Sequence, residues 1–199
     1  MSDAGNPNGT SPISRERGEF QRLRGRYPGY TRARLAQFAR RLKRTIYPAR
    51  ERAERIELAG PTERIGFDEA KALRYRTVDI GEPLGPLWST YWIRVTACVP
   101  KEWHGARVDL YWDSRSEALL WLDGKSRQGL NPGRHFDELT PCAQGGEILT
   151  FHVEVACNRA FGNAEAGHPP SEPYQLKGCE LRRFNGDAWS LFHDFDVLR

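Results

Sequence analysis

Long apolar runs are missing from this chain, and their absence excludes a membrane protein built on helices. No stretch approaches the roughly 20 apolar residues that a membrane-spanning helix needs. The start of the chain, Met1–Asn6, has no basic segment followed by an apolar one, so it does not look like a secretory signal peptide. We therefore expect a cytoplasmic protein that does not enter a membrane.

Cysteine is scarce and scattered, which argues against a structural zinc knuckle and against a redox motif. No two cysteines form a Cys-x-x-Cys pair. In a cytoplasmic chain we expect reduced thiols that are mostly buried. The cysteines are Cys98, Cys142, Cys157 and Cys179.

Apolar residues make up only 39% of the 199 residues, and the mean hydropathy is −0.68. These values favour one compact core together with a polar segment. Six Trp and nine Phe are many for such a chain, and large rings suit a thin core between two packed sheets.

The net charge of +4 comes from arginines crowded between Arg15 and Arg55. A basic arm of this kind suits nucleic acid or an acidic partner, but the sequence has no helix-turn-helix, zinc finger or RNA-binding aromatic motif. We therefore interpret the arginines as a solvated helix surface and expect no nucleic-acid partner.

We predict that the N-terminal part of the chain forms an arm made of two segments. Residues 1–29 are rich in Gly, Ser, Asn, Pro and Arg, which predicts disorder. Residues 30–76 form a helical and irregular segment. Its helix begins with Thr31 as a cap and ends before Pro48, and Gly60-Pro61 marks a loop further on. The apolar residues of that helix recur at helical spacing: Leu35, Phe38, Leu42 and Ile46.

Residues 77–184 change to a period of two, which predicts an antiparallel β-sandwich. Alternating runs lie at 91–99, 107–112 and 149–155, and a weaker strand at 176–184. Asp123-Gly124 directly follows the run 118–122 and indicates a hairpin turn. Over residues 185–199, apolar side chains return to helical spacing behind a candidate cap at Asp187, which predicts the start of a helix.

Six blocks of sequence resemble, in order and spacing, the N-terminal region of the cytosolic and vacuolar α-mannosidases of glycoside hydrolase family 38. The resemblance covers roughly residues 31–199. The blocks are Leu84–Trp92 (LGPLWSTYW), Val99–Trp103 (VPKEW), Leu110–Ser114 (LYWDS), Glu117–Gly124 (EALLWLDG), Gln128–Leu130 (QGL) and Phe151–Asn158 (FHVEVACN).

The resemblance implies a mainly β, jelly-roll-like sandwich similar to galactose-binding-like domains, flanked by an N-terminal amphipathic helix and a C-terminal helix start. In the family this region precedes a zinc-dependent catalytic domain, and residues 185–199 resemble the linker to it. His135-Phe136-Asp137 has the spacing of the family's first metal ligands but lacks the Trp that follows them. We therefore assign no catalytic residue, metal ligand or cofactor to this chain, and expect zinc only in the absent catalytic domain.

The implied role is a structural and interface domain, with an α-mannosidase catalytic domain as partner, in cis or as a split partner. We expect the isolated chain to be inactive and regard self-association as a further outcome. The docking surface would be an apolar face on the helix beginning near Asp187 and on the stripe of Leu35, Phe38 and Leu42.

Asp113 and Glu117 are the nearest approach to a catalytic carboxylate pair. A retaining glycosidase places its two carboxyl groups about 5 Å apart. Arg115 lies between these two residues and would hold both ionised, so we favour turn capping and a salt bridge over catalysis.

The alternative to a support role is a free-standing carbohydrate-binding module. Such sites combine an apolar wall with a few polar groups. We expect Trp112 and Trp121 to pack in the core. Trp103 follows Pro100 in a loop, where exposure to sugar is the alternative, but we favour core or inter-domain packing. The candidate contacts with carbohydrate or with a neighbouring domain are Trp88, Trp103, Asp113, Glu117 and Asn158.

Overall fold

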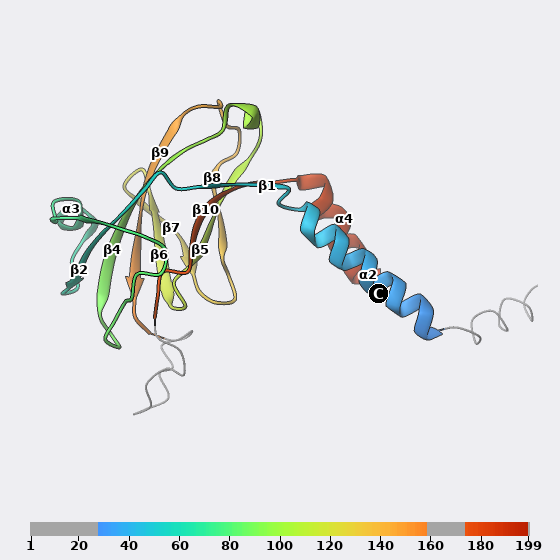
Figure 1. Cartoon of the computed structure of the whole chain (residues 1–199), viewed down its shortest axis with the longest axis horizontal. Coiled ribbons are helices and arrows are strands. Elements are labelled where there is room, and N and C mark those ends of the chain that lie inside the picture. The colour runs from blue at the N-terminus through green and yellow to red at the C-terminus, as the bar shows by residue number, and fades with distance from the viewer. Residues whose placement is uncertain (1–27, 159–173, 199) are drawn as a thin grey trace, which may run out of the picture. The chain divides into compact units, whose positions relative to one another are not determined.

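The computed structural model describes residues 28–158 and 174–198 (Figure 1). It divides into two compact units, one of residues 46–186 and one that contains the two long helices. The prediction of disorder for residues 1–29 falls, up to residue 27, outside the described residues.

The helical unit pairs α2 (Pro28–Thr45) with α4 (Gly186–Leu198). The rings of Phe38 and Phe195 meet edge to face, with centroids 5.0 Å apart. Both predicted helices are confirmed, although α2 begins at Pro28 rather than at Thr31. A proline is well accommodated in the first turn because its missing N–H has no partner inside the helix there.

The larger unit is an antiparallel sandwich, as predicted. One sheet has the order β1-β10-β5-β8 and the other has the order β3-β2-β4-β9-β6-β7. The strands are β1 (Ala49–Arg52), β2 (Arg55–Thr62), β3 (Arg76–Val78), β4 (Thr90–Cys98), β5 (Val108–Asp113), β6 (Glu117–Leu122), β7 (Lys125–Leu130), β8 (Phe136–Thr140), β9 (Ile148–Ala156) and β10 (Gly178–Arg183). The short helices are α3 (Phe67–Lys71) and the 3₁₀ turn η1 (Lys101–Trp103).

The predicted hairpin at Asp123-Gly124 is confirmed. Leu122 pairs with Lys125 across the turn, and both turn residues have positive φ, 51° and 75°. These angles fit the tight turns whose twist matches that of the flanking strands.

The segment 46–76 differs from the irregular chain that we predicted there. It contains β1, β2, α3 and the start of β3, and it belongs to the sandwich unit. We read Gly60-Pro61 as a loop, but both residues lie inside β2, where the pairing with β4 shifts register between Ala59 and Thr62. Such an irregularity tolerates Gly and Pro inside a strand.

The core lies between the facing sheets (Figure 1) and draws on both of them. Leu110 of β5 and Val153 of β9 are fully buried, and Trp112 is almost so. The strand residues that alternate with these point to the opposite face of their own sheet. The two-residue hydrophobic rhythm therefore corresponds directly to the burial observed in β4, β5 and β9.

Candidate functional site

The start of β6 and the end of β9 bring two of the predicted site residues together. Asn158 Nδ2 donates a hydrogen bond to Glu117 Oε2 at 2.8 Å. Ser116 Oγ donates to the Ala156 carbonyl and accepts the backbone N–H of Asn158 at 3.2 Å. Asn158 is only 7% exposed, and its Oδ1 has no hydrogen-bond partner among the described residues. A polar pair with one buried, unsatisfied acceptor thus lies at this end of the sandwich.

The loop before β4 holds Trp88 next to this pair. The backbone N–H of Trp88 donates to the Cys157 carbonyl at 2.7 Å, one residue before Asn158. Trp88 is 60% exposed, and its φ of 70° lies in the left-handed region that side chains other than glycine rarely adopt. The structure therefore gathers Trp88, Glu117 and Asn158, and we call these three residues the Trp88 site.

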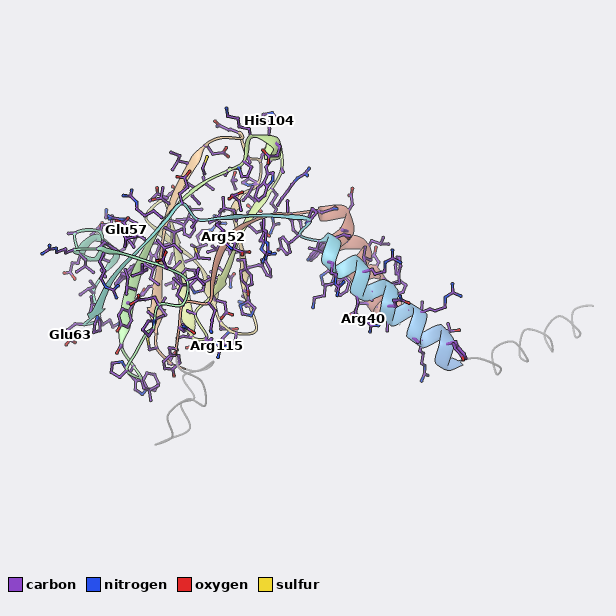
Figure 2. The ribbon with its side chains drawn as sticks, viewed as in Figure 1. Arg40, Arg52, Glu57, Glu63, His104 and Arg115 are labelled. Carbon is purple, nitrogen blue, oxygen red and sulfur yellow. The ribbon has the colours of Figure 1, made fainter. Side chains whose placement is uncertain are left out.

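Asp113 is the last residue of β5, directly before the turn to β6, and has a different role. Its Oδ1 accepts the backbone N–H of Arg115 at 3.0 Å, so the predicted turn capping is confirmed. Arg115 has a φ of 56° and lies at the end of the sandwich in Figure 2. A short polar side chain that satisfies the backbone two residues on is typical of such turns.

Trp103 is buried, as the favoured interpretation of core packing predicted, and the alternative of an exposed ring is wrong. It lies in η1, is only 3% exposed and belongs to the core cluster. The backbone bond from Gly105 N–H to the Ala143 carbonyl, at 2.8 Å, holds the turn against the chain that leads into β9. The proximity of Pro100 marked the turn correctly, but it did not show on which side the ring would lie.

Trp121 is also placed differently from our prediction, because it lies outside the core. Its neighbour Leu120 is fully buried in the core, so Trp121 points to the outer face of the larger sheet. There it stacks on Phe67 of α3, with centroids 5.0 Å apart and planes 10° apart. Trp92 lies beside it, at 5.8 Å between ring centroids.

His152 completes this outer aromatic cluster, which the sequence analysis did not find. Its ring meets Phe67 edge to face at 5.3 Å. Burial lowers the pKa of His152, and the charges of Arg94 and Lys71 lower it further. The sequence did contain a clue to the two tryptophans: Trp92 and Trp121 each stand next to a core residue in a strand, so their side chains point to the opposite face. No sequence pattern indicated that the short helix α3 would cover them.

A buried charge on the other sheet is satisfied by its neighbours. Asp109 is almost fully buried and accepts hydrogen bonds from Arg107 Nε at 2.7 Å and from Tyr47 Oη at 2.8 Å. Burial raises the pKa of the Tyr47 hydroxyl, with Asp109 as the next cause. Since these groups satisfy one another, the arrangement stabilises the fold and leaves no acid or base poised for chemistry.

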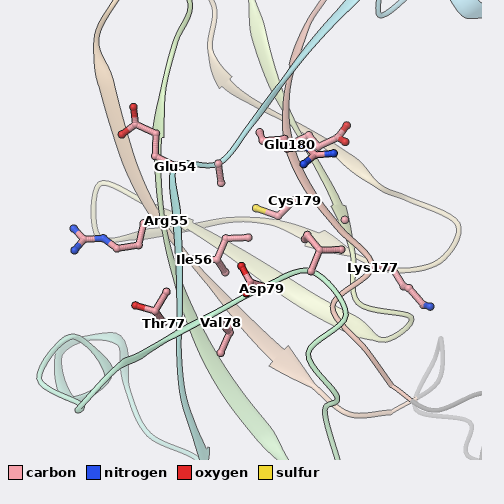
Figure 3. Close-up of a pocket in the computed structure, with 13 residues that line it drawn as sticks. Glu54, Arg55, Ile56, Thr77, Val78, Asp79, Lys177, Cys179 and Glu180 are labelled. Carbon is pink, nitrogen blue, oxygen red and sulfur yellow. The ribbon is translucent and has the colours of Figure 1, made fainter.

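A cleft of about 510 Å³ opens between β2, β3 and β10 (Figure 3). Its floor includes the buried side chains of Ile56, Val78 and Cys179, whereas Lys177 and Glu54 stand at opposite margins. Burial raises the pKa of the Cys179 thiol, which keeps it protonated and unreactive. The cleft therefore offers an apolar floor with a charged rim and no nucleophile.

Metal ligation has no support in the described parts of the chain, where no group of three or more His, Cys, Asp or Glu side chains is placed to hold an ion. His135 Nδ1 lies 2.9 Å from the Trp112 carbonyl, and Asp137 is half-buried in β8. Burial raises the pKa of Asp137, and the two side chains alone are too few to hold a zinc ion. His135 and Asp137 therefore do not fit a zinc site.

Among the helices of the described residues, none combines the length and the apolar content that crossing a membrane requires.

The fold and its end site define a jelly-roll-like β-sandwich domain that carries an exposed tryptophan and no assembled catalytic centre among the described residues. The model of the family described as "Alpha-mannosidase, jelly roll domain" matches residues 53–182. This chain belongs to that family.

Curated relatives agree with this assignment. Alpha-mannosidase G of Dictyostelium discoideum is 33% identical over 155 residues, covering 73% of this chain and 14% of the relative. Human alpha-mannosidase 2C1 is 35% identical over 144 residues, covering 68% of this chain and again 14% of the relative. The chain thus spans about one seventh of the length of these relatives.

Among solved structures, a Ruminococcus gnavus beta-glucuronidase aligns with a TM-score of 0.52. The alignment covers 67% of this chain and 28% of that one, at 11% identity. At so low an identity, this likeness shows a shared sandwich fold and carries no information about activity.

Proposed function

We propose that this chain acts as a structural and interface domain for the catalytic region of an α-mannosidase of glycoside hydrolase family 38, in cis or as a split partner. The observation that carries the proposal is the family match over residues 53–182, combined with the chain's 14% share of its relatives' length. Hydrolysis of α-mannosides, and the zinc it requires, would belong to the catalytic partner.

The arrangement of polar groups in the sandwich supports a non-catalytic role. The buried Asp109 is tied to Tyr47 and Arg107, and Asp113 caps a turn. A retaining glycosidase needs a carboxylate nucleophile and a nearby acid, with water or sugar between them. Each of these groups instead satisfies a neighbour in the fold.

Helix α4 is the proposed docking surface. Trp189, Leu191 and Val197 are exposed large apolar side chains on it, and Ala188 is buried. The helix also carries three Asp and no Lys or Arg, so a partner with basic residues around an apolar patch would complement it. A partner that docks on this helix would remove these side chains from water.

We further propose that the protein is located in the cytoplasm and that its four cysteines are reduced thiols there. All four are free in the structure. Two of them, Cys157 and Cys179, are buried, whereas Cys98 is partly accessible and Cys142 is exposed. Because disulfides persist in secreted proteins, free thiols favour a reducing compartment.

The test combines the full 199-residue chain with human alpha-mannosidase 2C1 from which the matched segment has been removed. We expect the two polypeptides to copurify and together to release nitrophenol from a nitrophenyl α-mannoside, while this chain alone releases none. Leu191→Asp should abolish copurification, whereas Ser190→Asp, exposed on the same helix, should not. Failure of the wild-type pair to associate, or hydrolysis by this chain alone, would show the proposal to be wrong.

A further inference from the structure

Two features of Trp88 reduce the stability of the fold, which indicates that the residue serves another role. Its backbone is in a conformation that a large side chain rarely adopts, and most of its ring faces water. Strained residues of this kind cluster at binding and catalytic sites. A flexible loop could relieve both costs by turning the ring inward.

The loop that carries Trp88 is instead held firmly in place. Gly81 N–H donates to the Leu176 carbonyl at 2.7 Å, and Leu84 N–H donates to the Tyr174 carbonyl at 3.0 Å. The Tyr91 hydroxyl donates to the Gly85 carbonyl at 2.6 Å. Together with the bond from Trp88 to Cys157, these contacts hold the backbone that carries the indole in place before any ligand arrives. Such preorganisation lowers the entropic cost of binding.

Polar groups lie close to the backbone of Trp88, because its N–H donates to the carbonyl of Cys157, one residue before Asn158. The half-buried Glu117 carboxylate is held by Asn158 Nδ2, and Asn158 Oδ1 is a buried acceptor without a donor among the described residues. Buried acceptors are normally satisfied, so an unsatisfied one next to an exposed ring points to a hydroxyl donor from outside the chain. Both groups accept hydrogen bonds and therefore select a ligand rich in O–H donors.

We propose that the Trp88 site binds a neutral pyranose unit of an oligosaccharide. The indole covers the apolar C–H face of the sugar ring, the Glu117 carboxylate accepts hydrogen bonds from ring hydroxyls, and a further hydroxyl approaches Asn158 Oδ1. Asn158 also acts as a positioning residue, because it fixes the orientation of Glu117. Uronic acids bind more weakly than neutral sugars because their carboxylate meets that of Glu117.

This site is independent of the support role proposed above, and its readout separates the two. The six indole N–H resonances of the ¹⁵N-labelled full chain are followed during titration with methyl α-D-mannopyranoside and, in parallel, with methyl β-D-glucuronide. We expect the Trp88 resonance to move saturably with the mannoside and to move less with the glucuronide. Trp88→Phe should abolish binding, measured by calorimetry. Trp189→Phe, which replaces the exposed tryptophan of α4, should leave it unchanged.

Glu117→Gln should reduce the affinity by about tenfold, since it replaces a charged acceptor with a neutral one of the same shape. Unchanged thermal midpoints would show that each variant still folds. If Glu117→Gln does not fold, the binding measurement on Trp88→Phe alone tests the proposed sugar site. The proposal is overturned if no indole resonance moves at the solubility limit of the mannoside, or if Trp88 and Trp189 shift equally. A Trp88 resonance that responds only to an α-mannosidase catalytic region would equally overturn it, because the surface would then be a protein contact.

Discussion

Arg94 of β4 donates two hydrogen bonds of 3.0 Å to the carboxylate of Glu57 of β2, from Nε to Oε2 and from Nη2 to Oε1. The two residues are directly paired across the strands. The guanidinium also lies over the ring of Tyr75, 4.3 Å from its centroid. Two parallel bonds of this kind fix geometry as well as charge, so the pair sets the register of β2 against β4.

Glu57→Gln should lower the free energy of unfolding at pH 7 by about 1 to 3 kcal/mol, the usual value of a hydrogen bond to a charged group. The bonds to Arg94 lower the pKa of Glu57 in the folded chain, so the stabilisation is complete above the unfolded pKa of about 4.3 and is lost as the pH falls below it. Urea denaturation at pH 7 and pH 3 measures both effects. Glu54→Gln, at an exposed position, is the control and should change neither; an equal loss there would contradict the assignment.

His152 should make the fold less stable in mild acid. Burial lowers its pKa in the folded chain, so the unfolded chain binds a proton at higher pH than the folded chain does. The free energy of unfolding should therefore fall as the pH drops through about 6.5. His152→Gln should flatten this dependence between pH 7.5 and pH 5.5 in urea midpoints, whereas His193→Gln, exposed on α4, should leave it intact. A wild-type stability that rises over this range would refute the prediction.

Gly145 should not tolerate a side chain. Its φ is 79°, and an added Cβ would lie 2.6 Å from the Lys101 carbonyl oxygen, a backbone atom that cannot move cheaply. Gly145→Ala should cost about 2 to 4 kcal/mol of stability through strain and overpacking. Gly129→Ala, in an exposed part of β7 with nothing within 4 Å, should stay within about 0.5 kcal/mol of wild type. Calorimetric unfolding of the two variants distinguishes them, and similar midpoints would contradict the close approach.

Leu110→Ala should remove a large part of the stability of the sandwich. Leu110 is completely buried between the sheets, and the cavity left by its truncation should cost about 2 to 5 kcal/mol. Leu191→Ala makes the same chemical change at an exposed position and should change the free energy of unfolding by less than about 0.5 kcal/mol. Guanidinium denaturation followed by tryptophan fluorescence checks both, and a similar loss at the two positions would argue against the core described here.

Strands with strict alternation were predictable, and strands without it were not. β9 alternates more and less buried side chains, and β4 and β5 do so after a run of three consecutive buried residues, so their apolar rhythm located them. β2 is buried at four consecutive positions: Ile56 and Leu58 belong to the core, and Glu57 between them is hydrogen-bonded to Arg94. Its Gly60-Pro61 also resembles a turn. β8, with the sequence FDELT, owes its place to pairing with β5 rather than to its own pattern.

The sequence indicated which residue types the candidate site would use, but not which residues the fold would bring together. Trp88, Glu117 and Asn158 are far apart in the chain, and only the antiparallel pairing of β6 with β9 makes the last two neighbours. Trp103 stood among the candidates because a proline-led turn is normally exposed. The ring is instead buried in the core, which removes it from the candidates for sugar contact and leaves the favoured packing role.

The order of apolar and polar residues by itself determined that the chain forms an antiparallel sandwich bordered by two helices, since side-chain period dictates which face of a strand or helix is buried. It also determined the family, because blocks of local sequence survive in order. Only the tertiary structure decided which tryptophans face water and which polar groups meet. Those outcomes depend on contacts between residues distant in sequence, which no local pattern encodes.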